Sequence, residues 1–370
     1  MKKLIIALIF SLLPSMVFAL PNGVWEQGNS NFGIAGSNRS TVHSWAIHEG
    51  KLFVGGTYIT NTMSILYSSD GVTWTSSTGT IFGTGCRRRH SASDGYLYCI
   101  TSASSPRITR SDTGEGAWTS IITLPSTLAY GRWCFEWLGY LYVSVKGDNN
   151  ETGAVYRCLL SNGCGTSGNW ASIYTMPTGI EMFSSMLVHG GAIYATTSNV
   201  PDADSGIYKS IDGTTFNKIS TTDFNVAGYQ LLHSLVFFNG AFYIGTHNSN
   251  NSPYRGAIYK STDYGVTWTK MFDFPDYEQE AYRLSVVDDT LFIGLVSAYT
   301  QGKGGIFYAT RDGINFIKIG DFVYGSSDYT GTQDISPPFN GYIHAGSVTP
   351  EDIPGIPVKW PISARIPVIR

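Results

Sequence analysis

The feature that most constrains this chain is a short motif that recurs along it at a nearly constant spacing. Each copy begins with a Ser or Thr, continues through an Asp and a Gly, and ends on an aromatic residue. Each also follows directly on an apolar run with an aromatic residue near its end. The well-formed copies are residues 69–74, 210–216, 261–268 and 310–316. Two weaker copies end at Trp118 and Trp170.

A second element precedes every copy of the motif. It consists of an apolar run, a Gly (an Asp in one copy) and another apolar run, which predicts two strands joined by a tight turn. Each unit of about 44 to 52 residues therefore holds four strands, the size and content of a propeller blade. The composition agrees, because Gly and Tyr are abundant, with 42 and 23 residues, while only 14% of residues are charged. The sequence predicts an all-β β-propeller with four-stranded antiparallel blades.

The two ends of the repeat array bear on the number of blades. A seventh inner hairpin spans residues 335–344, but no motif follows it. Near the N-terminus, Trp25 lies in a segment that looks like an outer strand without a blade. Joining these ends would close the ring and remove exposed sheet edges. We therefore expect residues 20–370 to form one propeller domain of seven blades, closed by the N-terminal strand around Trp25. Six blades with a trailing tail is the alternative.

The first residues have the features of a secretory signal peptide. Lys2 and Lys3 precede an apolar run, and small residues favour cleavage near Ala19. We expect residues 1–19 to be removed and the protein to be secreted or periplasmic, with no membrane-spanning segment. Acidic residues outnumber basic ones by 27 to 24, which argues against a nucleic-acid partner. We expect a monomer with no cofactor and no bound metal.

The chain has five cysteines, all within the part predicted to be exported, where disulfides can form. Cys158 and Cys164 flank a polar, turn-rich stretch, which predicts a local disulfide. Cys86 lies just before one predicted inner strand, and Cys99 lies in the next strand. These two cysteines can therefore also pair. One cysteine must then remain unpaired within the chain.

Residues 261–268 match the full pattern Ser-x-Asp-x-Gly-x-Thr-Trp. The array therefore resembles the Asp-box, or BNR-repeat, β-propellers of the sialidase-like superfamily. The Asp can accept backbone N–H groups within its turn, and the Gly permits a positive φ. We expect the Asp residues to be structural and to lie on the end of the ring away from any active site: Asp70, Asp212, Asp263 and Asp312.

A candidate site appears when each hairpin is read backwards from its turn Gly or Asp. Seven residues before that Gly or Asp, the inner strands carry mostly polar residues, although the strands are otherwise apolar. These residues are His43, Arg88, Arg132, Ser184, His233, Tyr282 and Asp334. These positions would face the mouth of the central channel, and Arg283 follows Tyr282. Arginine and histidine side chains suit an anionic or polyhydroxylated ligand. We predict that the protein binds a glycan-like or anionic ligand at the channel mouth through these residues, Ser184 excepted.

Two other functions remain open. The resemblance to sialidases implies a glycoside hydrolase in which Arg88, Arg132 and Arg283 hold a carboxylate. Tyr282 would then be the nucleophile, Glu280 or Glu278 its activating base and Asp334 the acid. A structural or protein-interaction platform is the other alternative, in which the polar channel is only solvated. We expect a binding protein rather than an enzyme.

Overall fold

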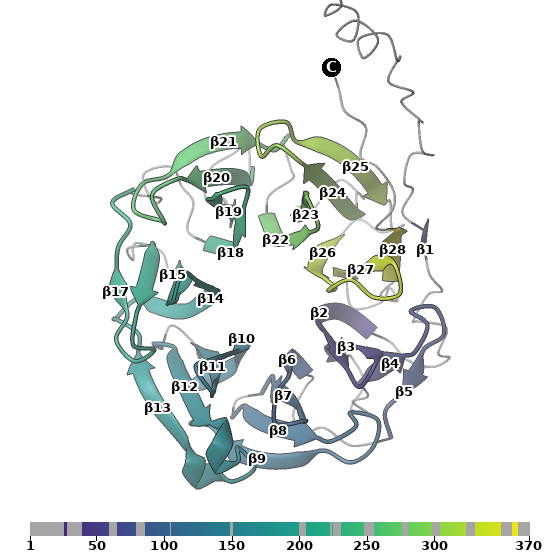
Figure 1. The fold of residues 1–370 in the computed structure, drawn as a ribbon, viewed down its shortest axis with the longest axis vertical. Helices are drawn as coiled ribbons and strands as arrows, with labels where there is room; N and C mark the ends of the chain where they lie inside the picture. Colours follow the sequence, from purple (N-terminus) through teal and green to yellow (C-terminus); the bar gives the residue numbers. More distant parts are fainter. Residues whose placement is uncertain are drawn as a thin grey trace, which may run out of the picture.

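The computed structural model describes residues 26–27, 39–58, 65–78, 86–103, 105–148, 151–199, 205–222, 224, 231–247, 255–275, 280–297, 304–322, 330–348 and 357–361. Within these ranges the chain consists of β-strands and two short 3-10 helices, η2 (Leu160–Asn162) and η3 (Ser167–Asn169), with no α-helix. The strands form a ring of antiparallel sheets around a central opening (Figure 1). The all-β propeller predicted from the repeat is confirmed.

Successive strands pair in seven antiparallel sets, which we number blades 1 to 7 in chain order. Blades 1 and 2 contain β2 (Arg39–His48), β3 (Lys51–Tyr58), β4 (Leu66–Ser68) and β5 (Thr75–Ser76), then β6 (Cys86–Ser91), β7 (Leu97–Thr101), β8 (Arg107–Ser111) and β9 (Thr119–Thr123). Blades 3 and 4 contain β10 (Leu128–Trp137), β11 (Tyr140–Gly147), β12 (Ala154–Leu159) and β13 (Trp170–Thr175), then β14 (Ile180–His189), β15 (Ala192–Asn199), β16 (Ile207–Ser210) and β17 (Asn217–Lys218).

The remaining blades follow the same plan. Blades 5 and 6 contain β18 (Leu231–Phe238), β19 (Ala241–His247), β20 (Ala257–Ser261) and β21 (Thr269–Asp273), then β22 (Glu280–Val287), β23 (Thr290–Ser297), β24 (Gly304–Thr310) and β25 (Ile317–Phe322). Blade 7 contains β26 (Thr330–Ile335), β27 (Tyr342–Val348), β28 (Pro357–Pro361) and, from the other end of the chain, β1 (Glu26–Gln27).

The first strand of each blade, here called the inner strand, lies next to the central axis (Figure 1). Each inner strand contacts the inner strands of the two neighbouring blades, and β26 lies beside β2, which closes the ring. The outer edge of blade 7 is completed by the N-terminal segment, because Glu26 and Gln27 pair antiparallel with Lys359 and Val358. Trp25 itself lies outside the described residues.

The apolar core lies between neighbouring blades. One cluster joins Tyr142 and Val155 of blade 3 to Phe183 and Ile193 of blade 4. Since both faces of a blade are covered in this way, strands such as β7 and β19 are buried along their whole length. That burial explains why the sequence shows apolar runs instead of the alternation of a half-exposed sheet.

The four well-formed Asp motifs share one hydrogen-bond pattern in the turn between the third and fourth strands. The carboxylate of Asp70 accepts from the backbone N–H of Val72 and of Thr73, both at 2.7 Å, and Asp212 and Asp312 make the equivalent pairs at 2.8 Å. In each of the four turns the preceding Ser or Thr hydroxyl accepts from the Gly N–H. These glycines have φ between 70° and 91°, where a side chain would be strained.

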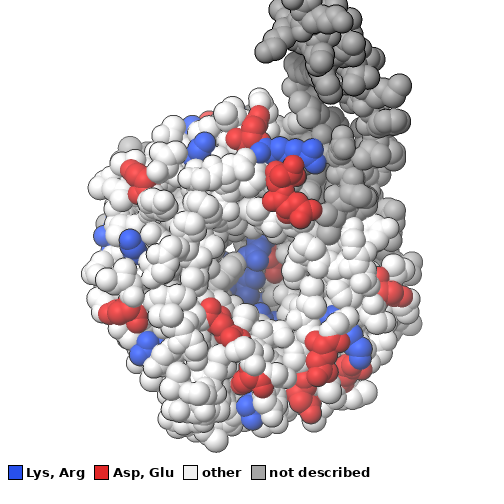
Figure 2. Space-filling model, in the orientation of Figure 1, with Lys and Arg blue, Asp and Glu red and all other residues white. Residues whose placement is uncertain are grey.

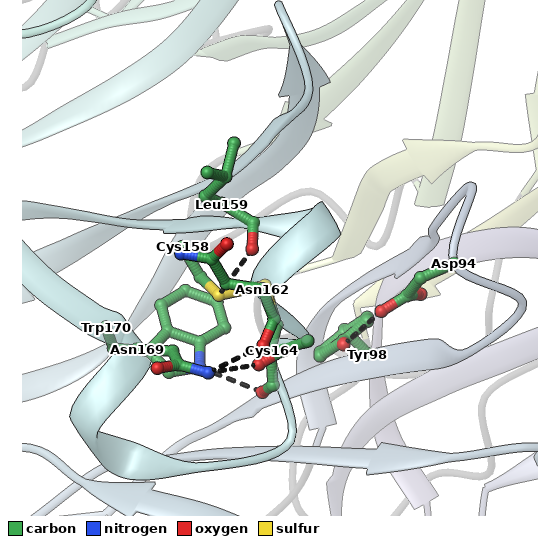
Figure 3. The surroundings of a disulfide bond; sticks show 9 residues. Asp94, Tyr98, Cys158, Leu159, Asn162, Cys164, Asn169 and Trp170 are labelled. Atoms are coloured by element: carbon green, nitrogen blue, oxygen red, sulfur yellow. Dashed lines mark hydrogen bonds between the residues drawn. A yellow bond between two sulfur atoms is a disulfide. The ribbon is translucent and has the colours of Figure 1, made fainter.

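Blade 3 makes the corresponding turn with a disulfide (Figure 3). Cys158 is the second-last residue of the third strand and is bonded to Cys164, and the indole of Trp170 donates to the Cys164 carbonyl at 3.0 Å. In the fully formed motif of blade 5, the Trp268 indole donates to the Gly265 carbonyl at the same distance. The tryptophan after each turn therefore donates to a carbonyl of that turn in both blades, although the two turns differ.

The predicted cysteine pairs are confirmed. Cys158 pairs with Cys164, and Cys86 pairs with Cys99 across the first hairpin of blade 2. Cys134 is the unpaired thiol. It lies on the inner strand of blade 3, and burial raises its pKa well above the usual value.

Candidate functional site

Every inner strand carries a β-bulge at the same level of the ring. In blade 1, Val42 pairs with Gly56 and Ser44 with Gly55, so His43 is the extra residue. The same interruption occurs in the other six inner strands, and its extra residues are here called the bulge residues: His43, Arg87, Arg132, Ser184, His233, Tyr282 and Gln333. A bulge bends a strand and changes the direction of a side chain. Its repetition therefore marks one equivalent backbone position in each of the seven inner strands.

The bulge also changes which residues face the channel. In a regular strand, consecutive side chains point to opposite faces. Because a bulge sets two residues against one partner, it interrupts this alternation. Tyr282 and Arg283 are consecutive, yet both contact residues of other blades near the axis. Figure 2 shows basic and acidic side chains inside the central opening.

One part of the site is an ion-pair cluster around Asp334. Arg283 Nε lies 2.6 Å from Asp334 Oδ1, and Arg88 Nη1 lies 3.4 Å from Oδ2. Both guanidinium groups also lie over the ring of Trp133, at 4.7 and 4.9 Å from its centre. Burial lowers the pKa of Arg88 to about 10, although the charge of Asp334 opposes this shift. The cluster joins blades 2, 3, 6 and 7 across the channel.

A second contact crosses the channel one residue nearer the start of the inner strands. Arg132 donates to the Tyr282 hydroxyl at 3.0 Å, which links blade 3 to blade 6. Arg87 lies 3.6 Å from the centre of the Tyr130 ring and also interacts with Tyr282. Burial favours the neutral form of Tyr282, but the charges of Arg132 and Arg87 outweigh it and lower its pKa. Nε of Arg87 and Nε of Arg132 are buried without a hydrogen-bond partner.

Blades 5 and 6 contribute the third part, a cluster of His233, His247 and Glu280. Glu280 Oε2 lies 3.5 Å from His233 Nε2, and its Oε1 lies 3.3 Å from His247 Nδ1. The two imidazole rings are stacked, with centres 5.8 Å apart. The His233 ring also lies 4.4 Å from the ring of Tyr282, centre to centre. Burial, followed by the nearby charges of His247 and Arg132, lowers the pKa of His233 well below its usual value.

The structure thus brings six of the residues that the sequence selected into contact clusters: Arg88, Arg132, His233, Tyr282, Arg283 and Asp334. His43 is the bulge residue of blade 1 and is buried. Ser184 is the bulge residue of blade 4, and its hydroxyl is buried without a hydrogen-bond partner. Glu280 faces the two histidines, while the Tyr282 hydroxyl is bonded to Arg132.

Counting back from the turn glycine selects the bulge residue in five blades and the residue after it in two. In blades 2 and 7 it selects Arg88 and Asp334, whereas the bulge residues are Arg87 and Gln333. The hairpins of these two blades have longer turns. In them the backbone N–H of Ala92 donates to the Tyr96 carbonyl, and the backbone N–H of Ser336 donates to the His344 carbonyl. The polar pair Arg87–Arg88 is visible in the sequence and could have indicated that both face the channel.

Trp133, Tyr130 and His247 also contribute to the site and were not predicted from the sequence. Trp133 and Tyr130 flank Arg132 in an aromatic-rich strand, which gives no signal that distinguishes them from core residues. His247 ends β19 and is paired in register with Glu280 of the next blade. Only the contact between blades brings these two together, so a pattern within one repeat cannot reveal it.

A separate hollow lies at the opposite end of the inner strands, between blades 2, 3 and 4. His90 Nε2 lies 3.3 Å from Glu136 Oε1 there, and burial lowers the pKa of His90 despite the opposing charge of Glu136. Phe135 and Met186 also line this hollow. None of its residues was selected from the sequence.

No protein-family model matches this chain, and no curated protein sequence matches it. Solved structures do share its fold. An ulvan lyase of a polysaccharide lyase family is 12% identical, with a TM-score of 0.57 over 90% of this chain and 93% of that one. The phage phi92 endosialidase is 10% identical, with a TM-score of 0.52 over 94% and 70%. A puromycin-hydrolysing peptidase of Mycobacterium tuberculosis is 12% identical, with a TM-score of 0.59 over 94% and 56%. At these identities the likeness shows the propeller fold.

A search of the described residues for a helix capable of crossing a membrane finds none.

Proposed function

We propose that this protein is an exported propeller that binds an anionic, glycan-like ligand at the mouth of its central channel. The channel mouth is the end at which the inner strands begin. The observation that carries the proposal is the convergence of four guanidinium groups, from Arg87, Arg88, Arg132 and Arg283, on one volume that also holds Asp334. Asp334 is paired with two of them, so positive charge remains in excess.

The two other arginines are the better ligand-binding groups. Arg132 is bonded to a phenol and Arg87 lies over a phenol ring, and neither interaction neutralises a guanidinium charge. Their buried Nε–H groups also have no hydrogen-bond partner. A carboxylate or sulfate would supply both the missing acceptors and the missing charge. Tyr130 adds an aromatic face beside Arg87, of the kind on which a sugar ring can pack.

The structural neighbours support the class of ligand. The ulvan lyase has been solved bound to a glucuronate–rhamnose sulfate saccharide, and another neighbour is an endosialidase. Both are proteins that act on acidic glycans, so this fold is compatible with such a site. We also propose that the Asp turns make this chain a member of the Asp-box repeat propellers, because their hydrogen bonds repeat in four blades.

The proposal is tested by binding of the mature chain to an array of sulfated, uronate-containing, sialylated and neutral glycans. We expect acidic glycans to be retained and retention to weaken with salt. Arg132→Ala and Arg87→Ala should each weaken binding by about 1–3 kcal/mol, as lost charge-assisted hydrogen bonds. The matched control is Arg157→Ala. Arg157 lies on the third strand of blade 3, away from the inner strands, and packs on the ring of Tyr140. Equal losses for Arg132→Ala and Arg157→Ala, or retention of neutral glycans alone, would contradict the proposal.

Cleavage of the glycan is the second candidate, favoured by the position of the Tyr282 hydroxyl beside Arg132 in the same channel. A tyrosine nucleophile suits an anionic sugar, which would repel a carboxylate. Two contacts favour binding alone, since Asp334 is held by two arginines and Glu280 faces two histidines. In a sugar-release assay, Tyr282→Phe should abolish turnover and preserve binding if cleavage occurs. Wild-type protein that binds without releasing any sugar excludes this candidate.

A further inference from the structure

The cluster of His233, His247 and Glu280 has the composition and the geometry of a metal site. His233 is the bulge residue of β18, His247 is the last residue of β19, and Glu280 is the first residue of β22. One possible ligand atom from each of the three lies within 4.8 Å of the other two. All three residues are at least nine-tenths buried. The backbone pairing of His247 with Glu280 fixes two of them relative to one another.

Hydrogen bonding does not account for this arrangement. Both ring nitrogens of His233 and Nδ1 of His247 are buried without a hydrogen-bond partner. Leaving such groups unsatisfied costs about 1–3 kcal/mol each. The contacts with Glu280, at 3.3 and 3.5 Å, are long for a charge-assisted hydrogen bond. Each contact, one to either oxygen of Glu280, is close to the 3.3–3.4 Å that separates two atoms bound about 2.0–2.1 Å from a tetrahedral zinc.

We propose that His233, His247 and Glu280 bind a divalent transition-metal ion of the zinc class. Two imidazoles and one carboxylate are the ligands that zinc and its first-row neighbours favour, whereas calcium and magnesium prefer sites made of oxygen atoms. Three protein ligands leave at least one coordination position for water or for a ligand. The expectation of a chain without a metal is corrected by this cluster, whose two histidines lie on neighbouring strands of blade 5 and whose carboxylate comes from blade 6.

The metal site goes beyond the proposed function and does not depend on it. The His233 ring packs against Tyr282, so an ion here would add positive charge to the same channel wall as Arg132. An acidic glycan in the channel would then meet a metal on one side and guanidinium groups on the other. Binding of the ion can nevertheless be measured in the absence of any glycan.

The test is a calorimetric titration of Zn²⁺ into the mature chain after treatment with a chelator, followed by the visible spectrum of the Co²⁺ form. We expect one ion per chain and the intense absorption of four- or five-coordinate Co²⁺. His247→Ala and Glu280→Gln should each weaken Zn²⁺ binding at least about 100-fold, since each removes one of three ligands. Glu280→Gln keeps the shape of the side chain, so it guards against a variant that merely fails to fold.

Two further variants make the outcome decisive. His189→Ala removes a histidine that packs on Phe237, away from the cluster, and should bind Zn²⁺ like the wild type. Cys134→Ser removes the free thiol and should also leave Zn²⁺ binding unchanged. Failure of the folded wild type to bind Zn²⁺ would show that the cluster is only an imidazole–carboxylate contact and would overturn the proposal. Binding that is lost in Cys134→Ser, or kept in both His247→Ala and Glu280→Gln, would overturn it as well.

Discussion

Substitution of Asp263 by Ala should destabilise the protein measurably and leave its ligand binding unchanged. Asp263 accepts from the Thr267 backbone N–H at 2.9 Å, from the Thr267 hydroxyl at 2.6 Å and from the Ser261 hydroxyl at 2.7 Å. The alanine variant loses all three hydrogen bonds in the turn between β20 and β21. This turn lies at the opposite end of the blade from the channel mouth, so a glycan or a metal ion should bind as before.

The size of the effect follows from the exposure of these bonds. A hydrogen bond to a charged group contributes about 1.5–3 kcal/mol when its loss leaves buried groups unsatisfied. Here the bonds from Thr267 are exposed, so water can replace part of the loss. We therefore expect the free energy of unfolding to fall by about 1–2 kcal/mol. For a chain of this size that corresponds to a melting temperature lower by about 1–3 °C.

The pH dependence of this effect has a defined sign. Burial opposes ionisation of Asp263, but the hydrogen bonds from Thr267 outweigh it and hold its pKa at about 2. The pKa of an Asp in an unfolded chain is about 3.9. The charged carboxylate therefore stabilises the fold fully above about pH 5, and this contribution falls as the pH drops through 4 toward 2. The difference in melting temperature between wild type and Asp263→Ala should be largest at neutral pH and smaller at about pH 3.

The assay is thermal unfolding followed by circular dichroism at both pH values, with Asp289→Ala as the matched control. The Asp289 side chain is 75% exposed and its contact with Arg311 is long, at 3.6 Å. Its loss should change stability by less than about 0.5 kcal/mol. If Asp263→Ala melts like Asp289→Ala at neutral pH, the turn carboxylate does not stabilise the blade and the reasoning fails. If Asp263→Ala instead melts normally but loses glycan binding, the two ends of the ring have been assigned the wrong way round.

Three further predictions concern the covalent and terminal structure of the chain. Mass spectrometry of protein recovered outside the cytoplasm should show a chain that starts just after Ala19. The same sample should show Cys158–Cys164 and Cys86–Cys99 linked and Cys134 free. Uncleaved residues 1–19 would contradict the predicted export. Cys158→Ser should destabilise the protein by about 2 kcal/mol and Cys134→Ser much less, because only the former opens a closed loop; equal melting temperatures would refute this. Deletion of residues 20–30 should lower the melting temperature markedly because it removes β1 from the edge of β28, and an unchanged melting curve would show that β1 does not close the ring.

The fold could be predicted from the sequence because a propeller is a local structure. Apart from β1 in blade 7, each blade pairs strands that follow one another in the chain. The motif around Asp263 and the hairpin before it therefore define one unit without any long-range information. The disulfide between Cys158 and Cys164 was predictable for the same reason, since only a short turn separates the two residues. The number and order of the hairpins follow from the repeat itself.

The candidate site was predictable only in part, because it depends on contacts between blades. The fixed offset from the turn found Arg132, His233 and Tyr282, but it could not show that Arg132 reaches across the channel to Tyr282. The longer turn of blade 2 moved the bulge from Arg88 to Arg87. Pairing of His247 with Glu280 depends on how two sheets lie against each other, and nothing within one repeat encodes that arrangement.

The bulge in every inner strand lets the lining of the axis vary independently of the ring. Each bulge residue is an insertion that the ladder on either side tolerates, so the strand pairing within its blade does not depend on its side chain. Histidine, arginine, serine and tyrosine occupy equivalent positions in blades 1, 3, 4 and 6 without altering the strands around them. A scaffold of this kind can acquire a new ligand through point substitutions at the axis, one blade at a time, while the strand pairing of each blade is kept. Directed evolution of this protein toward other acidic ligands would therefore begin with a library at these positions.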